Sequence, residues 1–287
     1  MKTLFPVAVV VAAIFALWYV FAVVLNAPWA YSKADRAGVA LSFSEMVSDT
    51  MVQEKPRLPA PHQVGAEIWK TTVEKKVTSK RSLIYHGWIT LRATLLGFAF
   101  GTGLGVLLAV SIVYFRVMDM SVMPWIIASQ TVPILAIAPM IVVVLAALQV
   151  NDIVAKGVIS MYLSFFPVVV GMVKGLRSPD HMLLDQMKTY SSSASQTFWK
   201  LRLPSSTPYL FTSLKVGVAA SLIGAVVAEL SLSQNGGLGA RLLAGSYYGQ
   251  TIQIWSALLS AATLAALMVF TMGLLEKMTL KRMGMAQ

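Results

Sequence analysis

Long apolar runs dominate this sequence and restrict what the chain can fold into. Runs of about 20 residues or more occur at Leu4–Leu25, Leu91–Phe115, Val122–Leu148, Ile153–Val173, Tyr209–Leu232 and Gln253–Leu275. A helix rises ~1.5 Å per residue, so each run can cross ~30 Å of hydrocarbon. The chain is 57% hydrophobic and 12% charged, and soluble domains carry about twice that charged fraction. We therefore expect an all-α membrane protein with six transmembrane helices.

The N-terminal run is longer than the ~7–15 residues of a secretory h-region, and no A-x-A pattern follows it. We predict a retained transmembrane anchor at residues 1–25. An outer segment then covers residues 26–87, a membrane core residues 88–276, and a tail residues 277–287. In the outer segment, Pro61 precedes apolar residues at a spacing of three to four, which predicts a short interfacial helix opened by that proline.

Basic residues in the short connecting segments predict the orientation. If the N-terminus is inside, the short outer loops contain only Lys156 and Arg241. The inner segments then carry Lys2, Arg116, Lys174, Arg177, Lys188, Lys200, Arg202, Lys215, Lys277, Lys281 and Arg282. Lys and Arg collect in cytoplasmic loops, so this distribution predicts that both termini are inside.

Several kinds of chemistry find no support in the sequence. There are no cysteines, no G-x-x-x-x-G-K-[ST] phosphate loop, and His62, His86 and His181 lie in different segments. We expect this chain to bind no metal, ATP or other cofactor and to perform no catalysis. The net charge of +11 fits contact with anionic lipid rather than with nucleic acid, because no basic stripe is interleaved with aromatic residues.

Polar residues inside the apolar runs are candidates for a transport pathway. Glu229 is the one acid within the predicted spans, where charged groups are costly. It either lines the pathway or sits near the outer end of its span, where it is solvated or hydrogen-bonded locally. Ser129, Gln130 and Thr131 precede Pro133 in the third run, and internal prolines permit kinks. That run is either a bent, packed helix or one that lines the pathway.

Gly97, Gly101 and Gly105 recur at a spacing of four in the second run. This spacing places them on one helix face, which indicates close helix packing.

The polar stretch at about residues 174–208 contains the most informative pattern. Asp185-Gln186-Met187 is followed by Ser191 and then by Leu201-Arg202-Leu203-Pro204. This resembles the E-A-A-x3-G-x9-I-x-L-P loop of permease subunits of prokaryotic ABC importers, with Asp for Glu, Gln-Met for Ala-Ala and Ser for Gly. In that family the loop forms two short helices that bend at the glycine and fit a groove on the ATPase. The residues that the resemblance assigns to ATPase coupling are Asp185, Gln186, Met187, Tyr190, Ser191, Trp199, Leu201, Leu203 and Pro204.

Other stretches occur in the order found in the nitrate/sulfonate/taurine-type permeases. They are Leu58-Pro59-Ala60-Pro61, Leu91–Phe98, Gln130–Pro139, and Ala228-Glu229 followed by Gly237-Leu238-Gly239. The resemblance implies a type I permease in a bacterial inner membrane. It also implies two paired permeases (two copies or two paralogues), two ATPase subunits that carry ATP and Mg, and a periplasmic binding protein.

Two other functions are considered beside this one. A secondary transporter working alone would need intramembrane ion carriers, and Glu229 is the candidate. A membrane-embedded enzyme would need clustered His, Asp or Glu at bilayer depth. The substrate stays open between small anions such as sulfonate, taurine or nitrate and pyrimidine or riboflavin precursors. Tyr247 and Tyr248 fit either a planar solute or the membrane interface.

Overall fold

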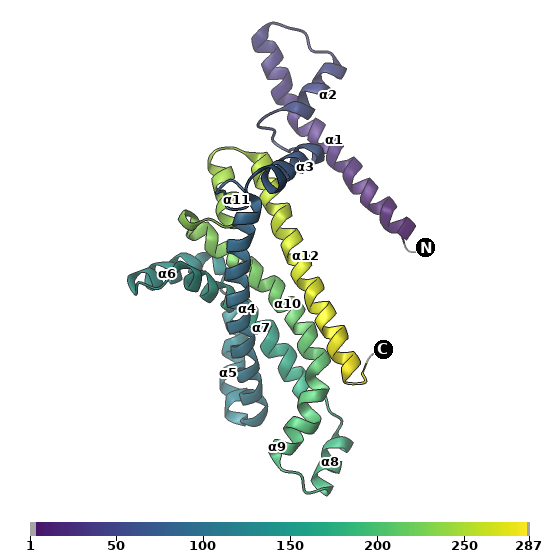
Figure 1. The fold of residues 1–287 in the computed structure, drawn as a ribbon, viewed down its shortest axis with the longest axis vertical. Helices are drawn as coiled ribbons and strands as arrows, with labels where there is room; N and C mark the ends of the chain where they lie inside the picture. The colour runs from purple at the N-terminus through teal and green to yellow at the C-terminus, as the bar shows by residue number, and fades with distance from the viewer. Residues whose placement is uncertain (1–3, 286–287) are drawn as a thin grey trace. The chain divides into compact units, whose positions relative to one another are not determined.

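The computed structural model describes residues 4–285, and Lys2 and the ends of the predicted anchor and tail lie outside them. Within the described residues the chain is helical and has no strand. The α-helices are α1 (Leu4–Ala37), α2 (Phe43–Val52), α3 (Pro61–Trp69), α4 (Leu83–Tyr114), α5 (Arg116–Ser129), α6 (Ile134–Ala147), α7 (Asp152–Leu176), α8 (His181–Thr189), α9 (Ala194–Thr197), α10 (Leu203–Ser231), α11 (Leu238–Tyr247) and α12 (Thr251–Arg282) (Figure 1). Three further short helices are η1 (Lys70–Glu74), η2 (Phe198–Arg202) and η3 (Ser233–Asn235).

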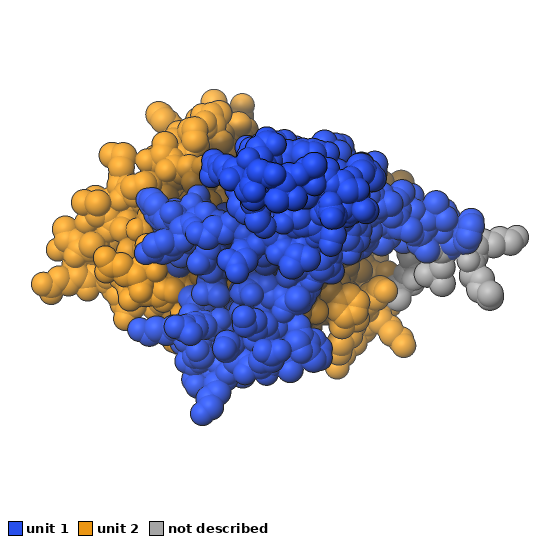
Figure 2. All heavy atoms as spheres, turned by 90° about the horizontal axis from the view of Figure 1, so that it is seen from above, with its two compact units in different colours: residues 1–87, 240–261 blue, residues 88–239, 262–287 orange. Residues whose placement is uncertain are grey.

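The chain divides into two compact units, which Figure 2 shows in different colours. Unit 1 comprises residues 1–87 and 240–261, and unit 2 comprises residues 88–239 and 262–287. Because each unit combines segments far apart in the sequence, contacts within a unit fix the relative positions of distant helices.

Five described helical segments are long and apolar enough to cross a membrane, and the count becomes six if the bent pair α5–α6 forms one span. Several spans are longer than the sequence indicated. The first helix continues twelve residues beyond Leu25 to Ala37, and α12 continues past Leu275 to Arg282. As a result Glu276 lies inside α12 and forms an ion pair with Lys215 of α10. The prediction that Glu229 is the one acid within the spans is therefore wrong, because Glu276 also lies inside a spanning helix.

The third predicted span, Val122–Leu148, is not a continuous helix. It is divided into α5 and α6, which meet at an angle of 101°. The break falls at residues 130–133, where Pro133 has no N–H to continue the α-helical ladder. The helix pair is thus far more sharply bent than a proline kink alone predicts.

The core of unit 2 is formed mainly by α4, α7 and α10. One buried cluster joins α4, α5 and α7, and its members are Ala109, Ile112, Ile126, Val169, Met172, Val173 and Leu176. A second joins Ala138 of α6, Ile159 of α7 and Ala228 of α10.

The glycine face of α4 lies against α7. A Cβ added at Gly97, Gly101 or Gly105 would come closer than 3.0 Å to side-chain atoms of Ser160, Ser164 or Val168, respectively. Both series advance by four residues, so the two helices run in the same direction and approach closely along one face. Gly103 points elsewhere, because a Cβ added there meets nothing within 4 Å.

In unit 1, the segment between α2 and α3 is held against α1 by a buried asparagine. Asn26 Nδ2 donates to the Leu58 carbonyl at 2.8 Å, and Asn26 Oδ1 accepts from the Arg57 N–H at 2.7 Å. Trp18 Nε1 donates to the Pro59 carbonyl at 3.0 Å. The helix predicted to open at Pro61 is α3, which begins at that residue.

Candidate functional site

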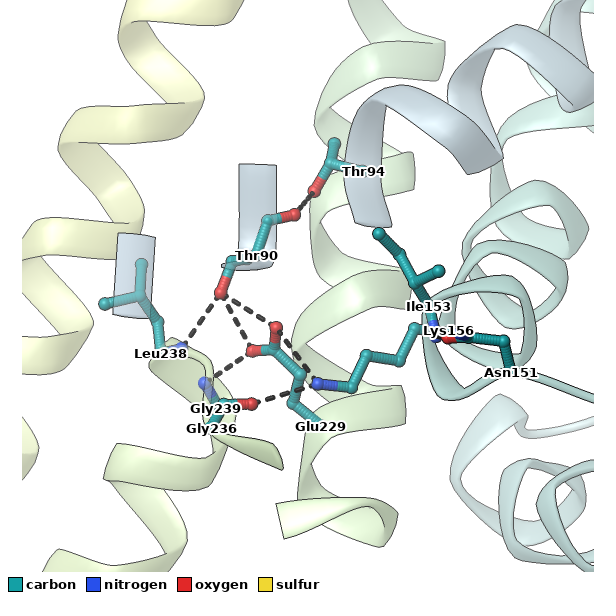
Figure 3. A network of polar contacts seen from close by, with 9 residues as sticks. All are labelled: Thr90, Thr94, Asn151, Ile153, Lys156, Glu229, Gly236, Leu238 and Gly239. Carbon is teal, nitrogen blue, oxygen red and sulfur yellow. Dashed lines mark hydrogen bonds and ion pairs between the residues drawn. The ribbon is translucent and has the colours of Figure 1, made fainter. Parts of the chain in front are cut away.

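Glu229 lies at the centre of a buried polar network in unit 2 (Figure 3). Thr90 Oγ1 of α4 lies 2.9 Å from both carboxylate oxygens of Glu229 and also accepts the Leu238 N–H at 2.9 Å. The Gly239 N–H donates to Glu229 Oε2 at 2.9 Å. The acid is fully buried, so these donors replace the water that an ionised carboxylate would otherwise need.

Lys156 supplies the opposite charge from α7. Its Nζ lies 3.9 Å from Glu229 Oε1 and donates to the Gly236 carbonyl at 2.9 Å. The sequence pattern predicted an outer-loop position for Lys156. This prediction is wrong, because Lys156 lies within the first turns of α7 and its side chain is 2% exposed. A single lysine after a polar helix start looks like a loop residue in sequence, and only the packing of α10 against α7 shows that it is buried.

The network fixes the turn between η3 and α11. Gly236 and Gly237 have φ values of 76° and 119°, a region that favours glycine. A Cβ at Gly237 would also collide with the Glu229 carboxyl group. Gly237 and Gly239 belong to the same sequence pattern as Glu229, whereas Gly236 was not part of it. The structure gives the physical link, because a Cβ at Gly237 or at Gly239 would collide with atoms of Glu229.

A cavity of about 550 Å³ adjoins this network within unit 2. Its polar lining includes Arg92 of α4, Lys156 and Asp152 of α7, and Asn235 of η3. Arg92 has no ion pair or side-chain hydrogen bond among residues 4–285 and is exposed. Among the described residues, the cavity therefore carries one unpaired cation, Arg92, beside amide groups and the buried Lys156–Glu229 pair.

The polar residues of the α5–α6 break are not joined to Glu229 by any hydrogen bond or ion pair within the described part of the chain. Ser129 Oγ donates to the Ile126 carbonyl at 2.7 Å, and Thr131 Oγ1 donates to the Ala128 carbonyl at 2.8 Å. Tyr162 of α7 donates to the Ser129 carbonyl. Gln130 is half-buried, whereas Thr131 and Pro133 are exposed. These groups cap the end of α5 at the break.

The segment between α7 and α10 contains α8, α9 and η2. Between α8 and α9, Ser191 has φ 52°, in the left-handed region, so the chain bends where the loop pattern has glycine. Tyr190 and Trp199 are 71% and 63% exposed. Asp185 and Gln186 are also exposed, whereas Met187, Leu201, Leu203 and Pro204 are half-buried. A salt bridge and hydrogen bond from Lys188 at 2.8 Å lower the pKa of Asp185.

The base of this segment is attached to the core of unit 2. Arg202 donates to the Leu176 carbonyl at the end of α7 at 2.8 Å, and Arg177 pairs with Asp119 of α5 at 2.8 Å. The ring of Phe198 contacts Tyr114 of α4 edge-on, with centroids 5.9 Å apart. Contacts of η2 therefore attach the end of this segment to α4 and α7, and Arg177 attaches its start to α5.

Comparison with known proteins decides the family. Residues 101–284, well over half of the chain, match the family described as binding-protein-dependent transport system inner membrane component. The chain belongs to this family. It is accordingly a multi-pass inner-membrane protein and a permease subunit of an ABC transporter for small solutes.

Relatives support the same assignment over most of the chain. The formylaminopyrimidine transport permease protein ThiX of Halalkalibacterium halodurans is 30% identical over 67% of this chain and 72% of its own. The putative aliphatic sulfonates transport permease protein SsuC of Bacillus subtilis is 25% identical over 76% and 79%. The nitrate import permease protein NrtB of Synechocystis is 26% identical over 85% of both chains. The family places this permease beside ATPase and substrate-binding subunits, and the solutes named for these relatives differ.

Proposed function

We propose that this permease forms the translocation pathway of an importer and is driven by ATP hydrolysis on partner ATPase subunits through residues 174–208. The observation that carries the proposal is the exposed aromatic pair Tyr190 and Trp199 on short helices whose base is fixed to the core of unit 2. Exposed aromatic side chains on a rigid base are typical anchors for a partner pocket. The chain itself binds no ATP or metal in this proposal, and it performs no chemistry.

The proposed cycle links ATP binding to the spans by mechanical coupling. When the ATPases close, they displace α8 and η2, and the contacts of Arg202 and Phe198 transmit the displacement to α7 and α4. The permease then alternates between inward and outward openings as the partner shifts its conformational equilibrium. Both termini and this segment are cytoplasmic, and α2 and α3 are outside.

Assembly follows from the family in the same proposal. Two permeases, either identical or paralogous, pair in the membrane, and a periplasmic binding protein delivers the solute. The cavity beside Arg92 and Asn235 lies on unit 2 and offers a cation and amide groups. These groups favour a small organic or anionic solute. The relatives are named for such solutes, which are aliphatic sulfonates, nitrate and formylaminopyrimidine. A secondary transporter without an ATPase partner is the alternative.

Substitutions in the segment test the proposal. We expect Met187→Asp and Ser191→Trp each to reduce ATPase co-purification and ATP-driven uptake in vesicles by about tenfold or more, because each disrupts the docking surface or the bend. Ser191→Gly is the matched control. It should retain both activities, since glycine adopts the positive φ of this position more readily than serine.

The readouts separate the two functions. Full co-purification and uptake in both disruptive variants, with the chain inserted normally, would contradict ATPase coupling through this segment. Uptake that continues without any ATPase would favour the secondary transporter.

A further inference from the structure

A second cavity, in unit 1, combines three basic side chains with an exposed tryptophan. Its volume is about 410 Å³, and it is lined by Pro28, Trp29, Ser32, Lys33, Arg36, Ala37 and Arg57. All but Arg57 belong to the last three turns of α1. Neither ATPase coupling nor solute passage uses these residues.

Hydrogen bonds from Asn26 of α1 hold the residues that form this cavity in place. The backbone of Arg57 is held beside α1 because Asn26 Oδ1 accepts its N–H at 2.7 Å. Asn26 is itself fully buried and also binds the Leu58 carbonyl. These bonds place the Arg57 side chain at the same cavity as Arg36, although the two residues are distant in sequence.

The charge of the cavity is only partly compensated. Lys33 Nζ pairs with Asp49 at 3.0 Å and lies 5.5 Å from the centroid of the Trp29 ring. Hydrogen bonds from Gln53 and Lys33 hold the pKa of Asp49 below its ordinary value, so that carboxylate stays charged. Arg36 and Arg57 have no ion pair or side-chain hydrogen bond among the residues that the structure describes. Two guanidinium groups are thus free to bind an anion, and the planar guanidinium matches phosphate oxygens well.

An apolar surface leads directly to this cationic cavity. Phe21, Leu25 and Trp29 are exposed and follow one another at a spacing of four, which places them on the same face of α1 as Ser32 and Arg36. The residues before Asn26 form the most apolar part of α1, a run long enough to span the hydrocarbon. The cavity therefore lies where that run ends, at the depth of lipid headgroups, and Trp29 is a residue type enriched at this depth.

We propose that this cavity binds the headgroup of an anionic phospholipid, with Arg36 and Arg57 on the phosphate and an acyl chain along Phe21 and Leu25. The site ties the outer end of α1 to the membrane surface. A soluble phosphate compound would meet the same guanidinium groups but would gain nothing from the apolar face. An acidic protein surface would bind the guanidinium groups, but it would not require the exposed apolar face formed by Phe21, Leu25 and Trp29.

The test uses the full-length chain in detergent, titrated with phosphatidylglycerol and followed by native mass spectrometry. We expect Arg36→Gln combined with Arg57→Gln to weaken apparent lipid affinity by about tenfold or more, because two charge-assisted hydrogen-bonding groups are lost. The control combines Lys76→Gln with Arg81→Gln, which removes the same charge from exposed positions of unit 1 and should leave affinity within about twofold of the unmodified chain. Arg36→Lys combined with Arg57→Lys should give an intermediate affinity, since charge remains but the guanidinium fork is lost.

Two further ligands identify the source of the phosphate. Phosphatidylcholine and glycerol 3-phosphate should both bind at least about tenfold more weakly than phosphatidylglycerol, since the first has no net charge and the second has no acyl chain. Equal affinity of the double glutamine variant and the unmodified chain, or an equal loss in the control, would overturn the proposal. Equally tight binding of glycerol 3-phosphate would also overturn it.

Discussion

Replacing Lys156 by methionine is expected to destabilise the folded chain by ~3–5 kcal/mol, because it leaves the buried Glu229 carboxylate without its counter-charge. The substitution also leaves the Gly236 carbonyl without the Lys156 donor. The thermal unfolding of the purified chain in detergent measures this effect. Lys174→Met is the matched control on the same helix, since Lys174 is exposed and its Nζ lies 5.8 Å from the centroid of the Tyr209 ring. We expect this substitution to cost no more than about 1 kcal/mol.

A double variant distinguishes a charge effect from a loss of packing. Glu229→Gln removes the uncompensated charge while keeping one side-chain oxygen for the Gly239 N–H. Lys156→Met combined with Glu229→Gln should therefore be more stable than Lys156→Met alone, a non-additivity of about 1–3 kcal/mol. If Lys156→Met is no more harmful than Lys174→Met, the pair does not hold the turn before α11.

The second large effect is expected at the glycine face of α4. Gly101→Leu adds a side chain where even a Cβ would meet Ser164 Oγ and the backbone of α7. Overpacking of this kind costs ~1–3 kcal/mol, and more where backbone must move, as it must here. We expect a clear loss of thermal stability and of folded yield from membranes, measured by size-exclusion chromatography in detergent.

Gly103→Leu provides a control with the same change two residues away. A Cβ at Gly103 meets nothing within 4 Å, so the added side chain has room and the yield should stay close to that of the unmodified chain. Equal yields for the Gly101 and Gly103 variants would show that the approach of α4 to α7 does not limit assembly.

The sequence predicted those parts of the fold that depend on local patterns, such as the length of an apolar run or the position of a proline. Apolar length located the membrane helices, and Pro61 located the start of α3. The extension of α1 beyond Leu25 was missed because its polar residues there resemble a loop, although Asn26 is buried by partners from residues 57 and 58. The 101° break was missed because proline signals a kink without stating its angle.

For the candidate site, the sequence indicated Glu229 but not its partners. Thr90 and Lys156 lie far from Glu229 along the chain and are brought to it only by the packing of α4 and α7 on α10. The alternative in which Glu229 is solvated is wrong, because the acid is fully buried. Thr90, Lys156 and the Gly239 N–H contact its carboxylate instead of water. The coupling role of residues 185–204 was predicted only from their resemblance to the loop of ABC importer permeases, because no physical rule identifies a coupling surface from its residues alone.

The most direct test of ATPase coupling is site-specific photo-crosslinking from position 190. A photoreactive phenylalanine analogue replaces Tyr190 in the full chain within native membranes, and the same analogue at Tyr247, which is 80% exposed, serves as the control. We predict that position 190 crosslinks to an ABC ATPase identified by mass spectrometry, whereas position 247 does not. Crosslinks from position 190 to lipid alone, or to the ATPase equally from both positions, would contradict it.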